Sequence, residues 1–191
     1  MDLSDEELID AYLGGDEDAF PLLLQRHLAD VYNFARRLGG GEDADDVTQE
    51  VFLKVWKNLK LYRRANAKFR TWLFSIARNT TIDFLRKKKH IAFSEFDTPE
   101  GGNPLTETLA DETPEPDELF AQAESAQQLE RALQALSPRA REVLLLRYRE
   151  DLTFDEIGAV LKEPLNTVKS RHRRALAALR DILKKNQNGA V

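Results

Sequence analysis

The sequence contains no cysteine and no long apolar run. Without cysteine there are no disulfides, no thiolate zinc sites and no thiol-based sensing, which fits a reducing cytoplasm. The longest apolar runs are far too short to span a bilayer, and there is no signal-peptide core, so we expect a cytoplasmic protein without membrane insertion. Its three histidines (His27, His90 and His172) lack metal-ligand spacing, and no glycine-rich phosphate loop is present. We therefore expect no metal, no cofactor and no enzymatic activity.

Strand-like alternation is also nearly absent, whereas apolar residues recur at helical spacing along most of the chain. This pattern predicts an all-α protein. Residues 91–118 are acidic and rich in proline, without a sustained period, and are predicted to form a flexible linker. The sequence thus predicts two small helical domains, residues 1–90 and 119–185, followed by a tail at 186–191.

The net charge of −5 hides a strong segregation of charge along the chain. Residues 60–90 carry a net charge of +9, and residues 91–126 carry −10. This separation says more about partners than the mean charge does. Because the two charges are opposite, the acidic segment could also lie over residues 60–90 and mask their positive charge from a partner.

The stretch from Thr153 to Leu183 has the pattern of a helix-turn-helix. Thr153 stands three residues before Glu156, which is the capping-box spacing, and Pro164 breaks the first helix. The second helix has a basic side, and residues 165–185 carry a net charge of +6, as expected for a helix that enters the major groove of DNA. Its apolar face comprises Val168, His172, Ala175, Leu176, Leu179 and Leu183, and its opposite face comprises Lys169, Ser170, Arg173 and Arg174.

Three helices are predicted in the first sixty residues. A capping box from Ser4 to Glu7 begins the first helix, and a long second helix carries an apolar stripe that includes His27 and Leu28. The third helix, residues 43–59, has an inner stripe of Val47, Val51, Val55 and Leu59. Its other side mixes acidic, polar and large apolar side chains, which favours a partner-binding surface over bare solvated surface. These are Asp46, Gln49, Glu50, Leu53 and Trp56.

A basic loop with an aromatic residue near each end spans residues 60–71, and a fourth helix is predicted over residues 71–89. Phe69 and Trp72 could pack in a core. Aromatic residues interleaved with cations are also what binding of single-stranded DNA requires. The apolar stripe predicted for the fourth helix is Trp72, Leu73, Ile76, Ala77, Thr80 and Phe84.

Two blocks of this sequence resemble bacterial sigma factors. The run DADDVTQEVFLKVWKNL resembles region 2.2, and FRTWLFSIARNTTIDFLRKKK resembles regions 2.3 and 2.4. The run beginning LSPRAREVLLLRYRED resembles region 4. The order of the blocks, the linker and the lack of a region 1.1 or a globular region 3 are typical of the extracytoplasmic-function (ECF) group.

This resemblance implies partners and roles for individual residues. It implies binding to core RNA polymerase, through the β′ clamp helices and the β flap, to promoter DNA in duplex and melted form, and to an anti-sigma factor. The residues implied for the β′ clamp helices are Asp46, Gln49, Glu50 and Trp56. Those implied for the minus-ten element, with the loop from Leu61 to Lys68 receiving a flipped base, are Tyr62, Arg63, Arg64, Lys68, Phe69, Trp72, Asn79, Asp83 and Arg86. Those implied for the minus-thirty-five element are Arg147, Lys169, Ser170, Arg173 and Arg174.

The sequence departs from the family pattern at two points. Asn166 replaces the glycine that usually precedes the Thr-Val-Lys-Ser-Arg run, and as a good capping residue it is expected to cap the recognition helix. The loop at residues 62–68 is slightly longer than usual and lacks its common glycine. A free-standing helix-turn-helix regulator remains the alternative, although such a protein would need neither the third helix nor the basic-aromatic fourth helix.

Overall fold

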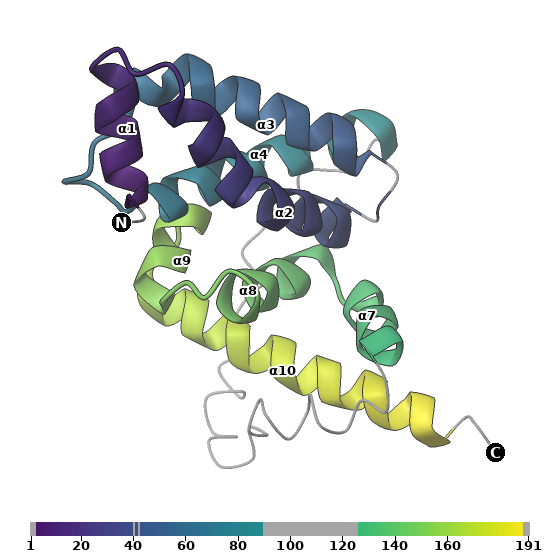
Figure 1. Ribbon diagram of the computed structural model, residues 1–191. Helices are drawn as coiled ribbons and strands as arrows, with labels where there is room; N and C mark the ends of the chain where they lie inside the picture. Colours follow the sequence, from purple (N-terminus) through teal and green to yellow (C-terminus); the bar gives the residue numbers. More distant parts are fainter. Residues whose placement is uncertain (1–2, 40, 42, 90–125, 189–191) are drawn as a thin grey trace. The chain divides into compact units, whose positions relative to one another are not determined.

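The computed structural model describes residues 3–39, 41, 43–89 and 126–188. All regular elements in these residues are helical, which confirms the predicted all-α class (Figure 1). The predicted linker lies outside the described residues, as does the resumption of helix predicted near Leu119. In chain order the elements are α1 (Asp5–Leu13), α2 (Ala19–Gly39), α3 (Ala44–Asn58), the short 3-10 helix η1 (Leu59–Leu61), α4 (Phe69–Lys89), α7 (Ala126–Ala135), α8 (Pro138–Tyr148), α9 (Phe154–Leu161) and α10 (Leu165–Asn188).

Contacts between Cα atoms divide the chain into two compact units. Among the described residues, the N-terminal unit contains α1 to α4 together with residues 155–163. The C-terminal unit contains α7, α8 and α10, with the residues from 149 to 154 that follow α8.

The ends of α1 form as the sequence predicts. The Ser4 hydroxyl accepts a hydrogen bond from the Glu7 amide at 3.2 Å, and the Glu7 carboxylate accepts one from the Ser4 amide at 2.7 Å. Gly14 closes the last turn, and Gly15 follows with φ +107°, a backbone conformation that strongly favours glycine. Pro21 lies in the first turn of α2, where its missing amide hydrogen costs no helical hydrogen bond.

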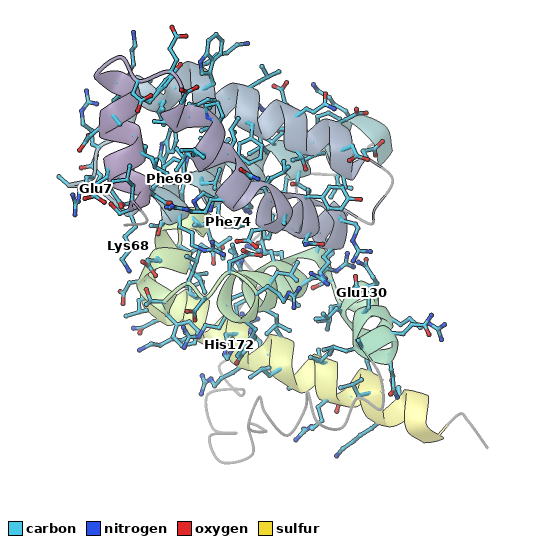
Figure 2. All side chains as sticks on the ribbon, viewed as in Figure 1. Glu7, Lys68, Phe69, Phe74, Glu130 and His172 are labelled. Atoms are coloured by element: carbon cyan, nitrogen blue, oxygen red, sulfur yellow. The ribbon has the colours of Figure 1, made fainter. Side chains whose placement is uncertain are left out.

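Four helices enclose the core of the N-terminal unit. Helix α2 packs against α1, α3 and α4, and α3 also packs against α4. At the centre, the ring of Phe34 meets that of Phe74 edge to face at 5.3 Å. Figure 2 labels Phe74 within this unit. Burying each large apolar side chain stabilises the unit by about 1.5–3 kcal/mol. The predicted inner stripe of α3, which comprises Val47, Val51, Val55 and Leu59, is fully buried and is confirmed.

Two predictions for the apolar stripes are wrong. Leu28 was placed on the buried stripe of α2, but it is 51% exposed, because it lies at the margin of the face that the neighbouring helices cover. Helix α4 buries a wider face than one stripe, since it contacts both α2 and α3. Phe74, Thr81 and Leu85 are therefore buried in addition to Leu73, Ala77 and Thr80, while Trp72, Ile76 and Phe84 are only half-buried.

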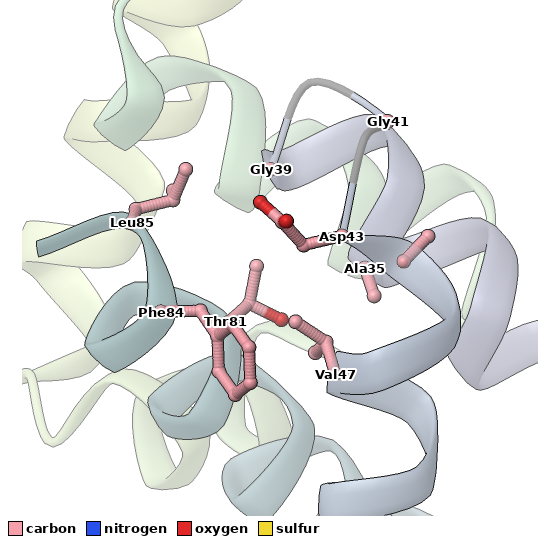
Figure 3. A pocket seen from close by; sticks show the side chains of 9 residues that line it. Ala35, Gly39, Gly41, Asp43, Val47, Thr81, Phe84 and Leu85 are labelled. Atoms are coloured by element: carbon pink, nitrogen blue, oxygen red, sulfur yellow. The ribbon is translucent and has the colours of Figure 1, made fainter. Parts of the chain in front are cut away.

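A small pocket lies where the ends of α2 and α4 approach the start of α3. Figure 3 shows Gly39, Asp43, Thr81 and Phe84 around it. Its volume is about 10 Å³, which is at the lower limit for a single water molecule. This pocket is therefore a packing defect and has no room for a small-molecule ligand.

In the C-terminal unit, α7 and α8 pack against α10. The Ser137 hydroxyl accepts from the Ala140 amide at 3.3 Å, and Pro138 begins α8, which confirms the predicted cap. The guanidinium of Arg141 donates to the carbonyl oxygens of Leu133, Gln134 and Leu136 at 2.6–3.1 Å. Arg141 thereby satisfies the last carbonyls of α7 and joins α7 to α8.

Helix α10 follows α9 after three residues, as the helix-turn-helix pattern predicts, and Lys162 in the turn has φ +56°. All six residues of the predicted apolar face of α10 are buried. The prediction that Asn166 caps α10 is wrong. The carbonyl of Pro164 accepts from the amides of Thr167 and Val168, so the helix begins at Leu165 and Asn166 lies inside its first turn. Proline is tolerated at this position because no helical hydrogen bond requires the amide hydrogen that it lacks.

Candidate nucleic-acid interface

The outer side of α3 presents acidic, polar and apolar groups together. Asp46 and Gln49 are exposed, and Trp56 is 51% exposed although it is one of the largest side chains. Glu50 is half-buried and lies 3.6 Å from the ammonium group of Lys54. The Trp56 indole donates to the Tyr12 hydroxyl at 2.8 Å, so its ring is held in place by a residue from α1. A fixed, exposed aromatic side chain among carboxylates is typical of a protein-binding surface.

Three aromatic rings gather where the 60–68 loop enters α4. Tyr62 lies 5.7 Å from Phe69 and 5.5 Å from Trp72, and Phe69 lies 5.8 Å from Trp72, between ring centroids. We call these three residues the aromatic cluster. Tyr62 and Trp72 are half-buried, whereas Phe69 is 1% exposed. The ring of Phe69 is thus covered by the packing of this unit and supports the rings of Tyr62 and Trp72, which are the two members of the cluster that expose surface.

Acidic residues of α1 hold this region, and sequence reasoning missed them. Asp5 accepts from Arg26 at 2.7 Å and lies 2.8 Å from Nε2 of His27, while Glu6 accepts from the Tyr62 hydroxyl at 3.3 Å. Burial raises the pKa of Asp5, but the hydrogen bonds from His27 and Arg26 outweigh it and the net pKa is lowered. Burial, with the nearby Glu6 carboxylate, raises the pKa of Tyr62 to about 12, so the phenol keeps its proton. Glu6 and Tyr62 are 56 residues apart, and no local pattern could have paired them.

Cationic and polar side chains surround the aromatic cluster and continue along α4. Arg63, Arg64 and Lys68 are exposed on the loop, and Arg63 donates to the carbonyl oxygens of Lys60 and Tyr62 at 2.6 and 3.0 Å. On α4, Asn79 is exposed and accepts from Arg78 at 3.3 Å. Arg86 is exposed and lies 3.4 Å from the half-buried Asp83. Aromatic rings next to exposed cations can stack on bases, while the cations follow a phosphate backbone.

A groove of about 610 Å³ runs along the start of α10. Lys169 and Arg173 are exposed there, and Ser170 is half-buried between them. The predicted residue Arg174 is half-buried and does not line the groove. Lysine and arginine on one exposed helix face can donate to guanine edges in a major groove. The residues that line the groove are Phe154, Asn166, Lys169, Ser170, His172 and Arg173.

Arg147 is fixed at the edge of this groove. Its Nη1 atom donates to the Leu152 carbonyl at 2.9 Å, and its guanidinium lies 5.1 Å from the centre of the Phe154 ring. The Phe154 ring meets His172 at 5.0 Å, and Nε2 of His172 is hydrogen-bonded to the Tyr148 hydroxyl at 2.8 Å. These contacts hold the Arg147 guanidinium beside the groove through a carbonyl oxygen and an aromatic ring, and neither of these carries a negative charge.

Protonation of His172 should weaken the C-terminal unit. Burial, with the charge of Arg147, lowers the pKa of His172 from 6.5 to about 4. Between these values the unfolded chain binds more protons than the folded one, so the free energy of unfolding falls with falling pH. The slope is at most about 1.4 kcal/mol per pH unit for one proton. Urea denaturation followed by circular dichroism at several pH values should show this loss in the wild type and a flatter profile in His172→Gln. Parallel profiles would contradict it.

Arg171, one of the cations counted in the net positive charge of residues 165–185, does not lie on the surface. Arg171 is buried, and its Nη1 atom lies 3.1 Å from Oε1 of the buried Glu142 on α8. Its charge is therefore balanced inside the unit. The predicted net charge of residues 165–185 overstates what DNA would meet, and Lys169 and Arg173 are the cations that α10 exposes in the groove.

The part of the chain that the structure describes contains no group of three His, Cys, Asp or Glu residues that could hold a metal ion. Within the same residues, no helix is both long and apolar enough to cross a bilayer.

Comparison with known proteins identifies both units. The sequence matches Sigma-70 region 2 over residues 23–91 and Sigma-70, region 4 over residues 132–181. The ECF RNA polymerase sigma factor SigW of Bacillus subtilis (strain 168) is 34% identical over 173 residues, which cover 89% of this chain and 91% of that protein. The ECF RNA polymerase sigma-E factor of Escherichia coli (strain K12) is 32% identical over 178 residues, 93% of each chain.

Solved structures have the same fold. CnrH, solved in complex with the cytosolic domain of CnrY, aligns with a TM-score of 0.67 at 27% identity over 95% of this chain and 97% of that chain. The sigma factor RpoE of Bartonella quintana, solved in complex with the anti-sigma factor NepR, aligns with a TM-score of 0.63 at 22% identity over 86% and 96% of the two chains. With both sigma regions matched and relatives similar over nearly their whole length, this chain belongs to the ECF group of RNA polymerase sigma factors.

Proposed function

We propose that this sigma factor divides promoter recognition between its two units. The C-terminal unit reads the minus-thirty-five element as duplex, and the N-terminal unit melts and reads the minus-ten element while bound to core polymerase. The observation that carries this proposal is the exposure of Lys169 and Arg173 on one side of α10, whose opposite side is buried. A helix held in this way can enter a major groove without losing its packing.

Duplex reading is assigned to the groove of the C-terminal unit. Lys169 and Arg173 supply donors for guanine edges, and Ser170 can donate or accept. Arg147 is placed to contact a phosphate, because its guanidinium is already oriented by Leu152 and Phe154. Phosphate contacts position the protein, and base contacts specify the sequence. Arg174 is kept as a candidate contact at the edge of this surface.

Melting is assigned to the N-terminal unit. Trp72 and Tyr62 offer faces for stacking on an extruded base, and Phe69 supports them from below. The exposed side chains of Arg63, Arg64 and Lys68 are assigned to the strand's phosphates, and Asn79, Asp83 and Arg86 extend the surface along α4. Unstacking a base costs a few kcal/mol, and stacking on an aromatic side chain recovers about 1–3 kcal/mol per base.

Core polymerase is proposed to bind the outer side of α3 through its β′ clamp helices, with the β flap meeting the C-terminal unit. Asp46, Gln49, Glu50 and Trp56 form the α3 contact. Glu50→Lys is expected to weaken binding to core polymerase at least tenfold, because reversing one charge of a complementary pair costs several kcal/mol. A pull-down with core polymerase measures this. Asp10→Lys makes the same charge change on an exposed position of α1 and should bind normally.

Glu50→Lys should leave the fold intact, because a solvent-accessible ion pair such as that of the half-buried Glu50 with Lys54 contributes at most about 1 kcal/mol. Wild-type binding by a folded Glu50→Lys variant would show that this side of α3 is ordinary solvated surface. Equal loss in Asp10→Lys would indicate a nonspecific charge effect and also count against the α3 site.

Regulation by an anti-sigma factor is also part of the proposal. Support comes from RpoE, which was solved bound to the anti-sigma factor NepR, and from CnrH, which was solved bound to the cytosolic domain of CnrY. A sigma factor held by such a partner until a signal arrives fits a stress or envelope-signal response. Because core polymerase is its target, the cytoplasm is its proposed site of action.

A further inference from the structure

Helix α1 reaches the loop that the proposed function places on melted DNA. Glu6 lies in the first turn of α1, before residue 23, where the match to Sigma-70 region 2 begins. Its Oε1 atom lies 3.3 Å from the Tyr62 hydroxyl and 3.4 Å from the amide nitrogen of Phe69. One carboxylate oxygen thus contacts residues at both ends of the loop, Tyr62 near its start and Phe69 just after its end.

The two contacts of Glu6 have different physical roles. The Phe69 amide belongs to the first residue of α4, where amides lack helical acceptors, so Glu6 satisfies a donor at the helix start. A carboxylate there also interacts favourably with the helix dipole. The Tyr62 hydroxyl is shared between Glu6 and the carbonyl of Ala67 at 3.0 Å, and this closes the loop upon itself. Together these bonds fix where Tyr62 stands relative to Trp72.

Asp5, which precedes Glu6, anchors the start of α1 to α2 and thereby keeps Glu6 next to the loop. Asp5 binds Arg26 and His27 on α2, and Arg26 also donates to the Leu3 carbonyl at 2.7 Å. The His27 ring lies 5.5 Å from that of Phe69, beneath the aromatic cluster. The start of α1 is thus tied to α2 on one side and to the loop on the other.

We infer that Glu6 is a positioning residue for promoter melting, which sets the geometry of the aromatic cluster by holding Tyr62 and the first amide of α4. This inference rests on the proposed function of the N-terminal unit. A negative charge close to a nucleic-acid surface would by itself repel phosphates, so its benefit must come from the order that it imposes. Pre-organised stacking groups capture an extruded base without first having to be ordered.

The variants separate positioning from charge. Glu6→Ala removes the acceptor, whereas Glu6→Gln removes the charge but keeps an oxygen that can accept from both donors. Asp10→Ala removes a carboxylate from an exposed position of the same helix and serves as the matched control. Tyr62→Phe removes one of the two donors and leaves the ring.

The first measurement is hydrogen exchange of the full-length protein, followed by mass spectrometry of peptides covering residues 59–75. Glu6→Ala is expected to speed exchange in these peptides at least tenfold, while the peptides of α3 exchange as in the wild type. Glu6→Gln and Asp10→Ala should match the wild type closely. Unchanged exchange in Glu6→Ala would overturn the tether.

The second measurement is transcription with core polymerase, on a promoter selected from a random library with the wild-type protein. Glu6→Ala should lower open-complex formation on duplex template by about ten- to hundredfold, which lies within the worth of stacking one extruded base on a well-placed ring. A template melted in advance at the minus-ten element should restore most of it. Glu6→Gln should melt duplex nearly as well as the wild type, and Tyr62→Phe should fall between them.

The outcomes distinguish the inference from the proposed function. Faster exchange with normal melting would make Glu6 merely structural and overturn the inference. Equal losses in Glu6→Ala and Glu6→Gln would assign the effect to charge and likewise overturn it. A wild-type protein that directs no initiation with core polymerase on any template would overturn the proposed function, and the inference with it, whatever the exchange data report.

Discussion

Replacing Arg171 with methionine is expected to lower the free energy of unfolding of the C-terminal unit by about 3–5 kcal/mol. Glu142 is 0% exposed, and Arg171 lies 3.1 Å from it with only 6% of its side chain exposed. Methionine has a similar length and suits the buried position, but it removes the guanidinium that lies 3.1 Å from the buried Glu142 carboxylate. Such a loss is a large fraction of the stability of a small domain.

The paired substitution isolates this effect. Glu142→Leu combined with Arg171→Met removes both charges, and it should recover most of the lost stability because a buried pair is often replaceable by apolar residues. Arg173→Met on the exposed side of the same helix is the matched control and should change stability by less than about 0.5 kcal/mol. A double variant as unstable as Arg171→Met would place the cost in packing and contradict the ion-pair explanation.

The chain provides its own probes for this measurement. Its two tryptophans, Trp56 and Trp72, both belong to the N-terminal unit. In urea denaturation, tryptophan fluorescence therefore follows the N-terminal unit, whereas circular dichroism at helical wavelengths follows both. Arg171→Met should lower the urea concentration at which the C-terminal unit unfolds. The circular dichroism transition should therefore begin at lower urea, while the fluorescence transition stays unchanged. An equal shift of both signals would show that the substitution affects more than the C-terminal unit.

Trp72→Ala is expected to block promoter melting while leaving closed complexes intact, and Arg173→Ala is expected to do the reverse. Loss of one stacking ring costs about 1–3 kcal/mol, which corresponds to a 5- to 150-fold loss of open complexes. Loss of one bidentate contact in the major groove costs a similar amount, but in binding of duplex DNA. The two losses should therefore occur at different steps of initiation.

Permanganate footprinting and filter binding measure these steps separately. With Trp72→Ala the start-site region should stay unreactive although DNA is bound, and a template melted in advance should restore initiation. With Arg173→Ala binding should fall, and melting of the DNA that is bound should be normal. If both folded variants fail at the same step, the division of labour between the two units is wrong.

Trp72 also packs on Phe69 and Tyr62, so its loss could loosen the N-terminal unit. Trp72→Phe keeps an aromatic face and should retain much of the melting activity, since stacking tolerates any ring of adequate size. Thermal melts followed by circular dichroism establish that each variant is folded. An unfolded Trp72→Ala with an inactive but folded Trp72→Phe would still locate the function in the indole.

Local sequence patterns determined much of this protein. The capping box at Ser4, the Ser137 cap of α8 and the buried stripes of α3 and α10 depend on residues within one or two turns, so spacing along the sequence is enough to predict them. The exposed side of α3 and the groove-lining Lys169 and Arg173 follow from the same periodicity, because a helix with one buried face must expose the other.

Only the tertiary structure decided which of the remaining polar and aromatic residues are available. Arg171 fits the basic pattern as well as Arg173 does, yet it is buried in an ion pair with Glu142. Phe69 fits the aromatic pattern as well as Trp72 does, yet its ring is buried where α4 begins. The contact of Glu6 with Tyr62 joins residues 56 positions apart. Such pairs form because folding brings distant segments together and then selects partners by burial and hydrogen bonding. Local periodicity predicts which face of its own helix a residue occupies. It does not predict which side chains from distant parts of the chain will contact that residue.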